Sequence, residues 1–222
     1  MSDEPVAKPT LAVFDIDGTI LPGCSAEQIF VRYLRSHGEL GLRDAARFAL
    51  SLLTALPRGW TSATKANKSY LSGKSIDRIE RLARECFREE ITHKISPVAC
   101  RKIKEHRTGG CQIVLLSGTL SPLLECFRHH LRVDGAWGVT LQVQGDRYTG
   151  NIDGIHPYGS GKVQIVHTSY GPGAYDIENS FAYADHSADL DFLQSFGNPF
   201  IVNATGRLAA KARRLGIGLI QF

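Results

Sequence analysis

The chain has 222 residues, of which 43% are hydrophobic and 22% charged, and its formal net charge is +4. This is an ordinary composition for a soluble globular protein, and no apolar run approaches the roughly 18–20 residues that cross a bilayer. The polar stretch Met1 to Thr10 does not resemble a secretory signal, and the five scattered cysteines favour free thiols in a reducing compartment, so we expect a cytoplasmic protein.

The first predicted element is a buried strand that ends in two acids. Leu11 to Phe14 is a short apolar run, followed at residues 15–19 by the letters D-I-D-G-T. Ligands bind at the carboxyl ends of strands in open α/β sheets, and residues i and i+2 of a strand face the same side. Asp15 and Asp17 are therefore expected to converge on one Mg²⁺ or one phosphate. Gly18 permits unusual dihedrals and a close approach of backbone to ligand. A plain Asp-Gly turn is the alternative.

The next eighty residues read as helices without a convincing strand, which most simply indicates an inserted helical subdomain. Helices are predicted over Ser25–His37 (with a Ser25–Gln28 capping box), Leu42–Leu56 (ended by Pro57), Thr61–Leu71, Ser75–Glu90 and Ser96–His106. From Leu40 to Gly109 there are 15 Lys and Arg against 7 Asp and Glu, a balance of +8, whereas the rest of the chain has 11 against 15. This basic segment indicates either an anionic partner or a solvated face.

After residue 110, strands and helices alternate. Strands are predicted over 111–116, 139–144, 147–152, 181–184, 200–203 and 218–221, with helices over 121–131, 159–170, 190–196 and 207–215. Such alternation implies right-handed crossovers and a Rossmann-like, doubly wound parallel sheet of the α/β class. We expect an α/β core from residues 1–21 and 110–222, and an inserted helical cap from 22–109, called the insert below.

Further polar residues follow the later strands or begin a helix. Ser117 and Gly118 end a strand, where a hydroxyl and backbone amides can hold phosphate oxygens. Lys162 lies near the start of a predicted helix. Asp185 ends a strand, and Asp189, four residues on, shares its helical face. Each has a structural alternative: a common turn, a solvated lysine, or acids that favour a helix N-terminus.

Together these motifs resemble, in type and order, the four motifs of the haloacid dehalogenase superfamily. The first motif of that family is D-x-D-G-T, as at residues 15–19, and the resemblance extends from Leu11 to Phe222. It looks closest to the phosphoserine-phosphatase-like branch, which has a small helical cap between its first and second motifs. The resemblance implies a Mg²⁺-dependent phosphatase that hydrolyses a small phosphate monoester through an aspartyl phosphate.

The resemblance also implies roles for individual residues. Asp15 would be the nucleophile and Asp17 the general acid and base, while Ser117, Gly118 and Lys162 would bind phosphate. Mg²⁺ would be held by Asp15, the backbone carbonyl of Asp17, and Asp185, with support from Gly18, Thr19 and Asp189. Two residues depart from the family pattern: Ala184 stands where glycine is usual, and His186 is interpreted as a loop residue because Mg²⁺ prefers oxygen ligands.

Three other functions are less well supported by the sequence. A dehalogenase has no need for Asp17. A phosphomutase or phosphotransferase would use the same aspartyl-phosphate chemistry and stays open. A non-enzymatic protein that binds anions, nucleic acid or a membrane through the basic insert would leave the acids and Lys162 unexplained. We expect a small phosphorylated metabolite as partner and no nucleic acid; nothing in the sequence indicates the oligomeric state.

The sequence further predicts that phosphoserine is not the preferred substrate. In phosphoserine phosphatases a glutamate shortly after D-x-D meets the substrate amino group, and the position in register here is Cys24. A neutral thiol cannot replace a carboxylate. Glu27 would take that place only if the loop slipped by three residues, which the predicted helix start at Ser25 disfavours.

Overall fold

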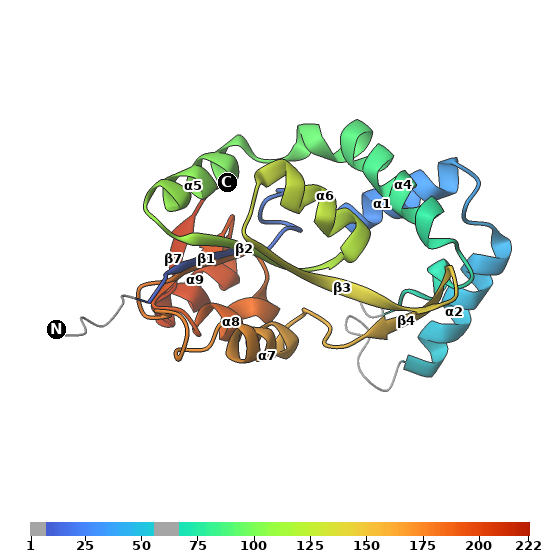
Figure 1. Cartoon of the computed structure of the whole chain (residues 1–222). Helices are drawn as coiled ribbons and strands as arrows, with labels where there is room; N and C mark the ends of the chain where they lie inside the picture. Colours follow the sequence, from blue (N-terminus) through green and yellow to red (C-terminus); the bar gives the residue numbers. More distant parts are fainter. Residues whose placement is uncertain (1–7, 56–66) are drawn as a thin grey trace.

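The computed structural model describes residues 8–55 and 67–222. Within them, seven strands form one sheet in the order β4-β3-β2-β1-β5-β6-β7, parallel except for the β3–β4 hairpin at one edge. The predicted α/β class is confirmed (Figure 1). The strands are β1 (Leu11–Phe14), β2 (Gln112–Leu120), β3 (Gly135–Gln144), β4 (Arg147–Asp153), β5 (Phe181–Ala184), β6 (Asn198–Val202) and β7 (Gly218–Ile220).

Helices cover both faces of this sheet (Figure 1). Helices α1, α4, α5 and α6 lie on one side, and α7, α8 and α9 lie on the other, while α2 lies near the β3–β4 hairpin. Their bounds are α1 (Ala26–Ser36), α2 (Leu42–Ala55), α4 (Ile76–Cys86), α5 (Pro97–Thr108), α6 (Ser121–Leu131), α7 (Ser160–Ser169), α8 (Leu190–Leu193) and α9 (Gly206–Arg214). None of the helices in the described residues is long and apolar enough to cross a membrane.

The central strand β1 is buried along its whole length. Ala12 and Phe14 pack into the apolar cluster under α1, α4, α5 and α6, whereas Leu11 and Val13 pack into the cluster under α7, α8 and α9. This alternation follows from the two-residue period of a strand. Because both faces are covered, the run is apolar throughout, and the first polar side chain, Asp15, falls at the carboxyl edge of the sheet.

Side-chain caps start two of the predicted helices where the sequence places them. The hydroxyl oxygen of Ser25 accepts from the Gln28 amide before α1, and that of Ser96 accepts from the Ala99 amide before α5. An N-cap oxygen satisfies one of the amides that have no partner inside the helix.

Several element boundaries differ from the sequence predictions. Strand β3 begins at Gly135, four residues before its predicted start, and β6 begins at Asn198, two residues before its predicted start. Strand β2 does not end at residue 116 but continues to Leu120, with a register irregularity against β3 after Leu116. The helix predicted over 75–90 ends at Cys86, and the chain continues as the π-helix η3 (Phe87–Ile91) and the 3-10 turn η4 (Thr92–Lys94). The helix predicted over 190–196 is only α8, preceded by the 3-10 turn η5 (Ser187–Asp189).

One predicted helix falls largely outside the described residues. Of the segment Thr61–Leu71, residues 61–66 are outside, as is Pro57, and Ser69–Leu71 forms the single 3-10 turn η2.

The β3–β4 hairpin supports the insert from the core side. The Gly73 amide donates to the Tyr148 carbonyl at 2.8 Å, and the Tyr148 amide donates to the Lys74 carbonyl at 3.0 Å. A Cβ at Gly150 would lie 3.0 Å from the Ser69 Cα, so the two backbones approach closely.

The division into core and insert stays a prediction. Helix α5 lies at the predicted C-terminal end of the insert. It contacts β2, and Arg107 donates to the Leu131 carbonyl, so these contacts group α5 with the core.

Candidate active site

Asp15 follows β1 and forms a buried ion pair. Its amide donates to the Tyr183 carbonyl of β5 at 2.9 Å, and its side-chain Oδ1 lies 3.1 Å from Lys162 Nζ. The same ammonium lies 3.1 Å from Asp189 Oδ2. Lys162 is only 2% exposed. Burial by itself lowers the pKa of Lys162, but Asp15 and Asp189 outweigh it and leave the pKa raised, so the lysine stays charged.

The start of α7 places Lys162 at this position. Lys162 is three residues after Gly159, which precedes the helix. A Cβ at Gly161 would lie 1.9 Å from the His156 carbonyl oxygen, so only glycine lets the first turn approach the loop this closely. Lys162 Nζ also lies 5.3 Å from the centre of the Phe192 ring of α8.

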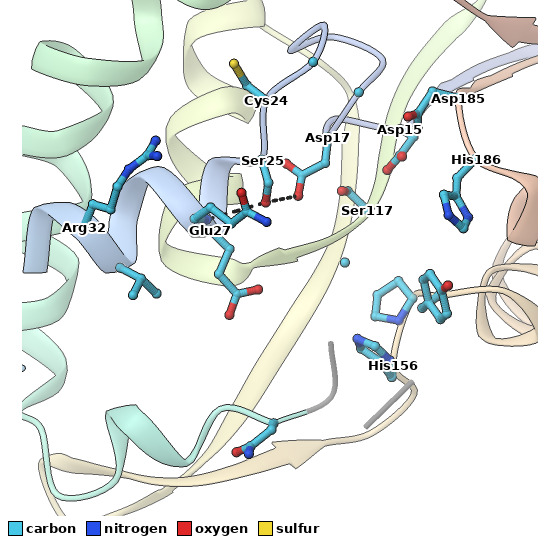
Figure 2. A pocket seen from close by; sticks show the side chains of 18 of the residues that line it. Asp15, Asp17, Cys24, Ser25, Glu27, Arg32, Ser117, His156, Asp185 and His186 are labelled. Carbon is cyan, nitrogen blue, oxygen red and sulfur yellow. Dashed lines mark hydrogen bonds between the residues drawn. The ribbon is translucent and has the colours of Figure 1, made fainter. Parts of the chain in front are cut away.

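The carboxylate of Asp17 has hydrogen-bond partners of its own and takes no part in the ion pairs that Lys162 forms with Asp15 and Asp189. Ser25 Oγ donates to Asp17 Oδ2 at 2.7 Å, and the Ala26 amide donates to Asp17 Oδ1 at 2.8 Å, so the acid is fixed at the N-terminus of α1 (Figure 2). Asp15 and Asp17 both line one cavity, and their convergence on one Mg²⁺ or one phosphate stays a prediction. Because β1 ends at Phe14, the i, i+2 rule for strands does not by itself place the two side chains. Burial, with a contribution from Asp15, raises the pKa of Asp17 to about 6.

Asp185 follows β5 and faces Asp15 across the end of the sheet (Figure 2). Burial, and then repulsion from Asp15 and Asp189, raises the pKa of Asp185 to about 7. Gly18, with a φ of +77°, makes room for this carboxylate, since a Cβ there would lie 1.9 Å from Asp185 Oδ2.

Two buried hydroxyls complete this end of the site. Ser117 on β2 is 1% exposed, and its Oγ lies 3.1 Å from Thr119 Oγ1. Thr19 is fully buried, and its Oγ1 has no hydrogen-bond partner in the described residues. Gly118 lies near the loop at His156 and Pro157, whose nearest atoms are 3.9–4.0 Å from the place of a Cβ.

The charge at this end of the site suits a hard cation. Four carboxylates, those of Asp15, Asp17, Asp185 and Asp189, line the cavity together with the Lys162 ammonium, and Asp189 Oδ1 has no hydrogen-bond partner in the described residues. Mg²⁺ takes oxygen ligands and keeps several waters, so two carboxylates and a carbonyl suffice. No group of three or more His, Cys, Asp or Glu side chains in residues 8–55 and 67–222 forms a ready metal-binding cluster.

A cavity of about 1450 Å³ extends from these acids along α1 to α2. Sequence reasoning placed its phosphate end but missed most of its walls. The missed residues include Gln28, Val31, Arg32 and Arg35 on α1, Leu40, Ala45 and Phe48 at α2, and His156, Pro157 and Tyr158 on the loop before α7. These walls form where segments distant in sequence pack together, and the periodicity of each segment carries no signal for that packing. His186 lines the cavity too, and its Nδ1 accepts from the Ala188 amide, as a loop residue would.

Glu27 has both carboxylate oxygens engaged. Lys68 Nζ, 1% exposed, bonds to Oε2, and the Tyr70 hydroxyl donates to Oε1 at 2.6 Å. Helix α1 begins at Ala26 behind its Ser25 cap, so the loop is not shifted by three residues. Cys24, directly before this cap, lines the cavity.

Comparisons with known proteins agree with this fold. The profile of haloacid dehalogenase-like hydrolases matches residues 12–194. The protein named phosphoserine phosphatase SerB1 from Mycobacterium tuberculosis is 25% identical over 224 residues, covering 98% of this chain and 72% of the relative. A Bordetella pertussis protein of unknown function has a TM-score of 0.81 at 23% identity, covering 96% of this chain and 99% of its own. A phosphoserine phosphatase, solved as a phospho-aspartyl intermediate analogue, has a TM-score of 0.64 at 18% identity. The match covers 96% of this chain and 93% of the phosphoserine phosphatase.

Proposed function

The chain belongs to the haloacid dehalogenase-like hydrolases, and we propose that it is a Mg²⁺-dependent phosphatase that cleaves phosphate monoesters through a phosphoenzyme on Asp15. The observation that carries the proposal is the buried contact of Lys162 with both Asp15 and Asp189 at the end of β1. It sets a carboxylate beside a fixed positive charge, the pair needed to attack a phosphate and to bind it.

In the first step an Asp15 oxygen attacks phosphorus and the ester P–O bond breaks. Asp17 donates its proton to the leaving oxygen. A pKa of about 6 suits this role, because both the protonated and the ionised form are populated near neutral pH. In the second step water attacks the phosphorus of the phosphoenzyme, Asp17 takes the water proton, and Asp15 and inorganic phosphate are released.

Three groups are placed to bind the phosphate oxygens. They are the Lys162 ammonium, the Ser117 hydroxyl and the Gly118 amide, all on the cavity wall. They would stabilise the charge that spreads over the equatorial oxygens during transfer. Mg²⁺, held by Asp15, the Asp17 carbonyl and Asp185, supplies further charge neutralisation when bound.

We also propose that phosphoserine is not the preferred substrate, although one relative bears the name phosphoserine phosphatase. An ammonium group needs a carboxylate partner in a closed site. Cys24 offers none, and Glu27 is already neutralised by Lys68 and bonded to Tyr70.

The experiment is a screen of phosphate release from phosphorylated metabolites and p-nitrophenyl phosphate, with Mg²⁺ and with EDTA. We expect release that EDTA abolishes and Mg²⁺ restores, and a lower kcat/KM for phosphoserine than for glycerol phosphate. Absence of release from every ester would refute the phosphatase. Transfer of phosphate to an added sugar, in place of release to water, would identify a phosphotransferase instead. A phosphoserine preference lost in Glu27→Gln would refute the substrate proposal alone.

A further inference from the structure

The cavity is larger than a small substrate needs. Ligand pockets usually enclose about 300–1,000 Å³, and this one encloses about 1450 Å³. Its phosphate end lies at Asp15, and its other end lies between α1 and α2, at Arg35, Leu40 and Phe48. A phosphate monoester with a short leaving group would occupy only the first of these ends.

The two acids that line the cavity along α1 and α2, beyond the phosphate end, both have cationic partners. Glu27 is bonded to Lys68 and Tyr70. Asp44 lies 3.1 Å from Lys74 Nζ and accepts from the Gly41 amide at 3.0 Å. Neither of them therefore offers an unpaired negative charge to a substrate.

The distal wall does carry unpaired positive charge. Arg32 and Arg35 are one turn apart on the face of α1 that lines the cavity, and neither forms an ion pair within the described part of the chain (Figure 2 shows Arg32). The basic residues of the segment 40–109 do not contribute, because none of those in the described ranges lines the cavity. The positive potential here thus comes from α1 and not from the +8 segment.

Apolar side chains line the cavity towards its distal end. Val31, Leu40 and Phe48 are half-buried there, which suits a methylene chain. Arg32 lies six residues after Ala26, whose amide holds Asp17. At the rise of an α-helix that separation is about 9 Å along the axis.

We propose that the site selects elongated phosphate monoesters whose leaving group carries a second anionic group, bound by Arg32 at the distal end of the cavity. The inference rests on the proposed phosphatase function. It assigns Arg32 as a specificity-determining residue, because an anion at that distance meets an unpaired guanidinium and no unpaired carboxylate.

The test uses phosphate monoesters of straight-chain ω-hydroxy acids of increasing length, each paired with its uncharged methyl ester. The measured quantity is the ratio of kcat/KM for acid and ester at low salt, with Mg²⁺. We expect the ratio to rise with chain length to about tenfold once the chain is long enough for the carboxylate to reach Arg32. In Arg32→Gln the ratio should fall to about one, and in Arg32→Glu the preference should pass to ω-amino analogues. The matched control is Arg43→Gln, an exposed position of α2 outside the cavity, which should keep the wild-type ratio.

Because the ratio is taken within one variant, a change in overall activity does not affect it. Equal values for acid and ester at every length in the wild type would overturn the inference and leave the phosphatase standing. A preference that persists unchanged in Arg32→Gln would overturn it as well, by locating recognition elsewhere. Absence of phosphate release from every ester, p-nitrophenyl phosphate included, would refute the phosphatase, and the inference would fall with it.

Discussion

The two ends of the cavity are built on different principles. At the phosphate end, Asp15, Lys162 and Asp189 are at most 6% exposed and contact one another at about 3.1 Å. At the distal end, Arg32 and Arg35 are exposed and have no ion-pair partner in the described residues. The groups proposed for chemistry are thus held by strand ends and burial, whereas the groups proposed for selection are side chains on a helix surface. Changes at the first end should alter rate, metal binding and stability, and changes at the second should alter substrate choice.

The largest effect is expected from Asp15→Asn. The amide cannot attack phosphorus, so turnover should fall by at least about a thousandfold for long and short substrates alike. Phosphate release measures the loss, thermal unfolding verifies the fold, and beryllofluoride should attach to Asp15 in the wild type only. The control is Asp134→Asn, since Asp134 accepts from the Ile113 amide far from the cavity. Appreciable turnover in Asp15→Asn would exclude the phosphoenzyme.

The second prediction tests whether the phosphate end is as tightly fitted as its contacts indicate. In Gly18→Ala the new methyl group would displace the Asp185 carboxylate, so we expect kcat/KM to fall about a hundredfold and the Mg²⁺ concentration for half-maximal rate to rise. Gly38→Ala is the control, because Gly38 has a φ of +73° but nothing within 4 Å of the added Cβ. Both variants carry the left-handed strain of about 1–2 kcal/mol. Equal activity of the two variants would show that Gly18 matters only for its backbone.

The third prediction concerns the link between the two ends, which is the hydrogen bond from Ser25 at the start of α1 to Asp17. That bond lowers the pKa of Asp17, so Ser25→Ala should raise it and shift the alkaline fall of kcat/KM to higher pH. The lost cap should also cost about 1 kcal/mol of stability. Ser96→Ala removes an equivalent cap from α5, and it should lower the melting temperature without moving the pH profile. A pH profile unmoved in Ser25→Ala would remove Asp17 as the titrating acid.

The smallest effect is expected at His106, outside the cavity, where Glu105 favours a charge on the ring less than burial and Lys102 oppose it. The ring lies 2.8 Å from the Tyr183 hydroxyl, and burial, then Lys102, lowers its pKa to about 4. The unfolded chain titrates near 6.5, so it binds more protons between these values. The contribution of His106 to the free energy of unfolding should be fully present above pH 6.5 and be lost as the pH falls towards 4.

We expect this pH dependence to amount to about 1–2 kcal/mol, less than the full shift implies because the ring is partly exposed. His106→Gln should flatten the curve of unfolding free energy against pH over that range. His129→Gln, at an exposed position, should leave the curve as it is. An unaltered slope in His106→Gln would mean that other groups account for the acid loss.

Sequence reasoning succeeded where a side chain is tied to a local pattern. The apolar run before Asp15 and the strand before Asp185 place both acids at one edge of the sheet, and the structure brings them together. The position of Lys162 was expected from the family resemblance, since one lysine at a helix start has no distinguishing chemistry. The bond from Ser25 to Asp17 was not expected, because it depends on how the chain turns after β1. Arg32 escaped notice because an exposed arginine on a helix is common and only the cavity singles it out.

The central position of β1 has a consequence for how the chain is made. Thr10 contacts Cys111, 101 residues later, and the Leu11 amide bonds to Ser180, 169 residues later. During synthesis at about 5–20 residues per second, the apolar strand 11–14 therefore stays without its β5 neighbour for roughly 10–40 s. An unpaired apolar strand is a template for association with other chains. Nascent chains released before Phe181 should accordingly be found in aggregates or bound to chaperones, whereas chains that extend past Val202 can bury β1 on both sides.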